Sequence, residues 1–87
     1  MFHTIASVTP LPDRKLLAVF KSGEVKLYDA GKLKEIWPVF EDFDVIPGLF
    51  ELVYVDKGGY GIVWNENLDL SCEEIWENGI PYKKHDA

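Results

Sequence analysis

The residue pattern most suggestive of catalysis is a pair of acids followed by a lysine. Pro12-Asp13 precedes Glu24-Val25-Lys26, which matches the loose PD…(D/E)xK form of metal-dependent nucleases, where both carboxylates hold one ion beside the attacked phosphate. An apolar run over residues 15–20 separates the two acids, and an extended chain rises about 3.3 Å per residue. The two carboxylates are therefore expected about 20 Å apart. A small metal-dependent hydrolase or nuclease-like enzyme is the alternative function, and this spacing weighs against it.

Other metal-ligating residue types are scattered. The acidic run Glu41-Asp42-Phe43-Asp44 lacks the regular oxygen-ligand spacing of an EF-hand. His3 and His85 lie near opposite ends of the chain, with no histidine or cysteine at metal-ligand spacing. We therefore predict no metal site and no bound cofactor, and we expect the acidic run to be a solvated loop.

Cys72 is the only cysteine, so no internal disulfide can form. A helix beginning at this position would lower the pKa of the thiol. However, Glu73 and Glu74 follow directly, and their negative charges oppose thiolate formation. Because no histidine is placed to act as a base, we predict a small, partly buried thiol and no catalytic residues.

The elements that would position these groups begin with a hairpin. Apolar runs at 16–20 and 25–28 flank a glycine-containing turn, a strong hairpin signal. With Ser22-Gly23 as a two-residue loop, Phe20 faces Val25 and Ala18 faces Leu27. The predicted core face then comprises Leu16, Ala18, Phe20, Val25 and Leu27, and the opposite face comprises Leu17, Val19, Lys26 and Tyr28. A three-residue loop with a bulge would shift this pairing by one residue and turn one strand over.

A second hairpin is expected around Gly58-Gly59. In that register Val55 faces Ile62 and Val53 faces Trp64, and these four side chains form one apolar face. Leu52 and Tyr54 lie on the other face.

The remaining segments carry boundary signals. Ile5–Pro10 is expected to be a strand, followed by a turn over residues 11–14. Asp29 is a candidate cap for a helix over Lys32–Trp37, which places Leu33, Ile36 and Trp37 on one face. Pro38 ends that helix, and residues 39–50 are expected to be irregular.

The last predicted helix begins and ends with clear signals. Ser71 is an N-cap candidate, Glu74 completes a capping box, and Gly79 is the expected residue after the helix. Ile75 and Trp76 should pack inward. The three tryptophans of the chain are expected in the core.

Length and charge limit the functions. The 87 residues carry a net charge of −6, which fits one domain over residues 1–82 with a short polar tail at 83–87. No Lys or Arg occurs between Lys57 and Lys83, so this surface repels nucleic acid and suits a basic protein partner.

No apolar run reaches the ~18–20 residues of a membrane span, and the start lacks a signal-peptide pattern. A cytoplasmic location is expected.

The order of these motifs resembles the DUF2442 family of small bacterial proteins. The resemblance is carried by residues 8–13, the Phe-x-Ser-Gly-Glu-Val hairpin at 20–25, and residues 62–71 running into 74–79. It implies an α+β fold with three strands, a helix, two strands and a closing helix. It also implies that some members act as antitoxin-like partners of a second small protein, and it supplies no catalytic residues.

Together these features predict a non-enzymatic interaction or regulatory module. Its fold would be α+β, with an N-terminal strand, two β-hairpins and a short C-terminal helix packed on the sheet. It would bind a protein partner or itself, without direct nucleic-acid or membrane binding. The candidate interaction surface comprises Leu17, Val19, Tyr28, Leu52, Tyr54, Glu73 and Glu77.

Overall fold

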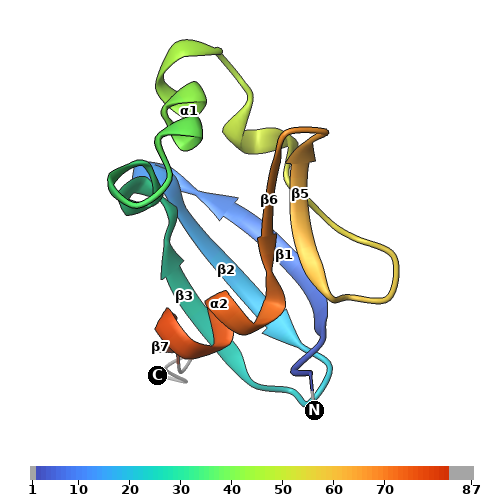
Figure 1. Cartoon of the computed structure of the whole chain (residues 1–87). Coiled ribbons are helices and arrows are strands. Elements are labelled where there is room, and N and C mark those ends of the chain that lie inside the picture. The colour runs from blue at the N-terminus through green and yellow to red at the C-terminus, as the bar shows by residue number, and fades with distance from the viewer. Residues whose placement is uncertain (1, 83–87) are drawn as a thin grey trace.

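The computed structural model describes residues 2–82, which form a mixed α+β domain with two antiparallel sheets (Figure 1). The predicted tail at 83–87 lies outside the described residues. The four-stranded sheet has the order β1-β2-β3-β7, with bounds β1 (Ile5–Leu11), β2 (Lys15–Phe20), β3 (Val25–Asp29) and β7 (Ile80–Pro81). The three-stranded sheet comprises β4 (Tyr54–Val55), β5 (Gly61–Asn65) and β6 (Leu68–Ser71).

Helical turns connect the strands. They are α1 (Asp42–Val45), α2 (Cys72–Asn78) and the 3-10 turns η1 (Pro12–Arg14), η2 (Ala30–Glu35), η3 (Pro38–Glu41) and η4 (Phe50–Leu52). The predicted α+β class is confirmed, whereas the predicted element order is incomplete. It lacked β6 and β7, which extend one sheet each and flank α2 on either side along the chain.

The register of the first hairpin differs from the two-residue-loop prediction by one residue. Val19 pairs with Val25 and Leu17 with Leu27. The loop is three residues long, because Phe20 N donates to Glu24 O at 2.8 Å and Gly23 adopts φ +96°, which favours glycine. The shift turns β3 over, so Tyr28 and Lys26 face the core while Val25 and Leu27 face outward.

The second hairpin has the predicted register. Val55 pairs with Ile62 and Tyr54 with Val63. Ile62 and Trp64 are buried, and Val53 and Val55 pack against the core. Leu52 and Tyr54 are exposed, as expected for the other face.

The segment after β3 departs further from expectation. The Asp29 carboxylate caps η2 by accepting from Gly31 N at 3.0 Å, as predicted. The turn is a 3-10 helix that ends at Glu35, so the 3.6-residue spacing behind the predicted shared face does not apply. Leu33 is buried, whereas Ile36 and Trp37 are 61% and 43% exposed.

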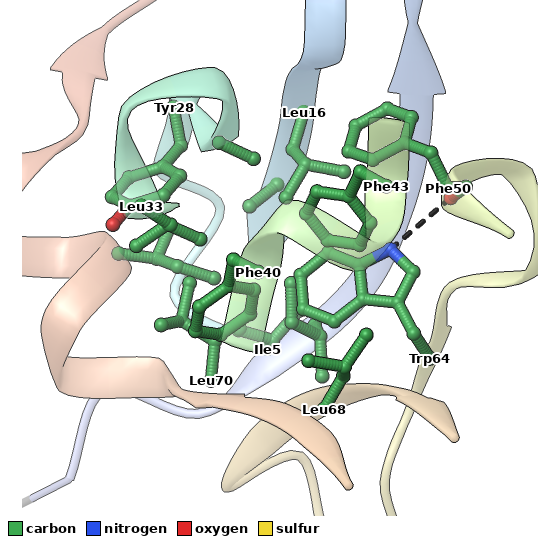
Figure 2. Close-up of a cluster of buried hydrophobic side chains, with 14 of the residues drawn as sticks. Ile5, Leu16, Tyr28, Leu33, Phe40, Phe43, Phe50, Trp64, Leu68 and Leu70 are labelled. Atoms are coloured by element: carbon green, nitrogen blue, oxygen red, sulfur yellow. Dashed lines mark hydrogen bonds between the residues drawn. The ribbon is translucent and has the colours of Figure 1, made fainter. Parts of the chain in front are cut away.

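Residues 39–50 are irregular only in part, because short helical turns in η3, α1 and η4 cover most of the segment. Phe40, Phe43 and Phe50 are buried from these turns, and Leu49 is buried just before η4. Figure 2 shows the first two and Phe50 gathered around Trp64, whose indole nitrogen donates to Phe50 O at 3.1 Å. This aromatic cluster fills the space between the two sheets at the end of the molecule where α1 lies (Figure 1).

Helix α2 closes the domain on the inner face of the four-stranded sheet (Figure 1). Ser71 Oγ accepts from Glu74 N at 3.1 Å, which confirms the predicted cap, and Ile75 is fully buried. Lys26 donates to Trp76 O at 2.5 Å and lies 4.3 Å from the Trp76 ring centre. Gly79 directly follows the helix, as predicted, with an extended backbone at φ −76°. Glycine fits here because a Cβ would lie 2.5 Å from Ile75 O.

Candidate interaction surface

The nuclease-like acids do not meet. Asp13 lies in η1, before β2, and Glu24 lies beyond the far end of that strand. In the part of the chain that the structure describes, no group of three or more His, Cys, Asp or Glu side chains could hold a metal ion. The geometry expected from the sequence therefore holds for this pair.

The acidic run at 41–44 is tied into the fold. Asp44 binds Lys34 Nζ at 2.7 Å and lies 3.8 Å from the Arg14 guanidinium. The hydrogen bond from Lys34 holds the pKa of Asp44 below its usual range. Arg14 also donates to Phe43 O at 2.6 Å. This carboxylate therefore joins three segments of the chain, while Glu41 and Asp44 remain exposed to solvent as expected, in short helical turns instead of a loop.

The Cys72 thiol is buried, as predicted. Its side chain is 1% exposed, and burial, with the charge of Glu73, raises its pKa. His3 lies close by, because its backbone N–H donates to Glu73 Oε2 at 2.6 Å and its ring stacks on Trp76 at 3.8 Å. His85 lies outside the described residues. Glu73, predicted as part of a docking surface, instead anchors the N-terminal segment.

The outward face of the four-stranded sheet carries an apolar patch. Leu17 lies directly opposite Leu27, and Val19 lies opposite Val25. All four side chains are partly exposed, and none belongs to the core cluster or packs against it. Ile80, which pairs with Leu27, extends the patch and is 68% exposed. We call these five residues the outer face.

The predicted surface residues are only partly brought together. Leu17 and Val19 lie on the outer face, as expected, but Tyr28 does not, because the register shift buries it to 4% exposure. Leu52 and Tyr54 are exposed at η4 and β4, in a different part of the molecule. Glu77 is exposed on α2.

Two adjoining hollows lie beside the segment that joins η2 to η3, one next to β3 and the other next to β6. The edge groove, of about 620 Å³, is lined by Leu27, Tyr28, Leu33, Ile36 and Ile80, together with Trp37, Glu74 and charged residues. The acidic groove, of about 480 Å³, is lined by Trp37, Val39, Phe40, Asn67, Asp69, Leu70, Ser71 and Glu74. Leu27 and Ile80 belong both to the edge groove and to the outer face, so the three features form one continuous region.

The Glu74 side chain, which lines both grooves, is held in place by two hydrogen bonds. Its Oε2 accepts from Tyr28 Oη at 3.0 Å and from Asn78 Nδ2 at 2.8 Å, instead of returning to the Ser71 backbone as the predicted capping box requires. Figure 2 shows the Tyr28 ring beside Leu33 with its hydroxyl oxygen at the margin of the cluster. Burial, with Glu74 beside it, raises the pKa of the Tyr28 hydroxyl well above its ordinary value. The hydroxyl therefore stays a donor and fixes the carboxylate.

Sequence reasoning missed several residues that shape the grooves and the outer face. Trp37 and Ile36 were assigned to a buried helical face, and Val25 and Leu27 to the core. For Trp37 the sequence carries a signal that the helix does not include it, because Pro38 restricts the residue before it to extended backbone. Trp37 has φ −126° and ψ 101°. The second pair depended on a loop length that the sequence left open.

Comparison with known proteins gives a family and no function. A family model described as "Protein of unknown function (DUF2442)" matches residues 5–81. No curated protein matches the chain, and no solved structure matches it. Among residues 2–82, no helix has the length and apolar character needed to cross a membrane.

Proposed function

Because the chain belongs to the DUF2442 family, whose description records no function, we propose its role from its surface: a non-enzymatic, cytoplasmic protein-interaction module. The observation that carries the proposal is the outer face. Its two cross-strand apolar pairs and Ile80 form an apolar area on one face of a small sheet. Contiguous apolar area of this kind on a small domain is typical of a protein interface.

The proposed occupant is a partner protein with a basic surface. The net charge of −6 makes two copies of this chain repel each other, whereas it attracts a cationic partner and speeds their encounter. Charge complementarity therefore favours a different protein over a second copy. The apolar outer face would supply the buried centre of the interface, and the polar side chains around it would form the rim.

The test compares matched surface variants against a purified partner. A partner recovered by cross-linking would be purified and titrated against the wild-type chain and against L17S/L27S, with V45S as control. Val45 is 69% exposed on α1, away from the outer face. We expect the double variant to weaken binding about tenfold or more, as loss of buried apolar contacts does, and V45S to leave it unchanged.

Two results would overturn the proposal. One is a tagged chain that recovers only itself as a monomer at both low and high salt. The other is an L17S/L27S variant that keeps its fold and binds the partner as well as the wild type does. A homodimer that the double variant dissociates would replace the basic partner with a second copy.

The resemblance to antitoxin-like members supports a narrower version of the same role. In that version the partner is a second small, toxic protein encoded beside this chain. Co-expression would show growth protection by the wild type and by V45S, and loss of protection by L17S/L27S. Equal protection by all three would separate the antitoxin-like role from the outer face.

A further inference from the structure

One indole and one carboxylate lie where the two grooves meet. Trp37 and Glu74 line both the edge groove and the acidic groove. Trp37 comes from the junction between η2 and η3, and Glu74 from the first turn of α2. An aromatic ring and a negative charge, from two elements far apart in the sequence, therefore both line the boundary between the two grooves.

The Glu74 carboxylate and the Trp37 ring are both held in place by neighbouring side chains. Glu74 Oε2 receives two hydrogen bonds, from Tyr28 and Asn78, and among residues 2–82 no bond reaches its Oε1. The Trp37 ring is 43% exposed and rests against Phe40, with ring centres 6.2 Å apart. Because the two side chains are already held in place, binding of a ligand would require little further ordering of them, which lowers the entropic cost of binding.

The charges around the junction fit a cation. The lining of the acidic groove includes Asp69 and Glu74 and no Lys or Arg. In the edge groove, Lys15 is paired with Asp29 at 3.5 Å and Lys32 adds a positive charge to the lining, so the negative charge of the junction lies on its acidic-groove side. Apolar side chains flank the junction on both sides, with Ile36 and Ile80 in the edge groove and Val39 in the acidic groove.

We propose that this junction binds an arginine side chain carried by an extended segment of the partner protein. A guanidinium is planar, so it can stack on the Trp37 indole while it donates to the Glu74 carboxylate. Apolar residues on either side of the arginine would occupy the flanking parts of the grooves. The inference rests on the proposed function, whose partner it characterises, but its two anchoring residues, Trp37 and Glu74, lie outside the outer face.

The experiment titrates two model peptides into the ¹⁵N-labelled chain and follows its amide and indole NMR signals. The probes are acetyl-Leu-Gly-Arg-Gly-Leu-amide and the same peptide with glutamine in place of arginine. We expect the arginine peptide to shift the Trp37 indole N–H and the amides around Glu74, with an affinity about threefold to tenfold above that of the glutamine peptide.

Charge-matched variants distinguish the site from general attraction. E74Q and W37A should each weaken the arginine peptide about threefold or more. E77Q removes the same charge from α2 at an exposed residue that lines neither groove, and it should leave the affinity unchanged. D69N removes a negative charge from the acidic groove and leaves the Tyr28 and Asn78 contacts in place. If E74Q fails to fold, D69N therefore replaces it as the test of whether groove charge contributes to binding of the arginine peptide.

Three outcomes would overturn the inference: equal affinity for the two peptides, equal weakening by E74Q and E77Q, or shifts confined to the outer face. Each of these can occur while L17S/L27S still abolishes partner binding, in which case the proposed function stands without the arginine site. Conversely, peptide binding at the junction with an unaffected L17S/L27S variant would retain the site and remove the outer face.

Discussion

At the scale of single residues, Cys72 shows how surroundings override position. It begins a helix, where the partial positive charge of the N-terminus favours a thiolate. Burial in the core and the negative charge of Glu73 act in the opposite direction and raise its pKa. The net effect is an unreactive thiol that packs as a small apolar side chain.

This predicts slow alkylation. In the folded chain at neutral pH, Cys72 should react with iodoacetamide at least about tenfold more slowly than in denaturant, because reaction requires local opening. Mass spectrometry of timed samples measures both rates on the same protein. Equal rates in the two conditions would show that the thiol is accessible and would reopen a chemical role for it.

At the scale of elements, the length of each hairpin loop decided whether its strand pairing could be predicted from the sequence. The second hairpin was predicted with the correct pairing of Val55 and Ile62, and the Ser71 cap of α2 was also predicted. The first hairpin has the same apolar runs, but one extra loop residue turned β3 over. Because strand side chains alternate between faces, that single residue exchanged Tyr28 for Leu27 on the outer face.

The aromatic segment shows a different limit. Phe40, Phe43 and Phe50 lie in short turns, where neither the strand period nor the α-helix period applies, so their burial left no pattern to detect. The grooves were missed for a different reason. They arise where the short η2 turn ends at Glu35 and leaves Trp37 at the surface, whereas the predicted helix over residues 32–37 placed that side chain on a shared apolar face.

Helix α2 is predicted to depend on its packing. It has seven residues, too few to be stable alone, and Trp76 connects it to the four-stranded sheet. The Trp76 ring meets Phe20 edge-on at 5.0 Å and lies over Lys26. We expect W76A to destabilise the fold by about 3 kcal/mol, the low end for a large buried aromatic because the ring is only partly buried.

Urea unfolding followed by far-ultraviolet circular dichroism measures this loss. The matched control is Y54A, which removes an aromatic ring that is 55% exposed on β4 and should cost less than about 1 kcal/mol. Similar losses in the two variants would show that the Trp76 contacts contribute little and that α2 is held by Ile75 and the backbone.

At the scale of the whole molecule, polar contacts join segments distant in the sequence. His3 is bound to Glu73, seventy residues further along, and Arg14 connects η1 to α1 through Phe43 and Asp44. The first tie joins the N-terminal segment to α2, and the second joins η1 to α1.

Two of these ties make stability depend on pH. The backbone hydrogen bond from His3 lowers the pKa of Glu73 from its ordinary value of 4.5, and the bond from Lys34 lowers the pKa of Asp44 from 3.8. A carboxyl group whose pKa is lower in the folded state stabilises the fold above its unfolded pKa. That contribution is lost as the pH falls through the lowered folded pKa, when both groups take up a proton.

We therefore expect the free energy of unfolding to be level near neutral pH and to fall progressively below about pH 4.5. The E73Q/D44N variant should be less stable than the wild type at pH 7 and should show a shallower decline with acidification, because its two ties no longer titrate. E66Q/E77Q, which removes the same two charges at exposed carboxylates, is the matched control and should follow the wild-type curve. If E73Q/D44N loses stability on acidification as steeply as the wild type, other carboxylates hold the fold together, and the long-range ties are incidental to it.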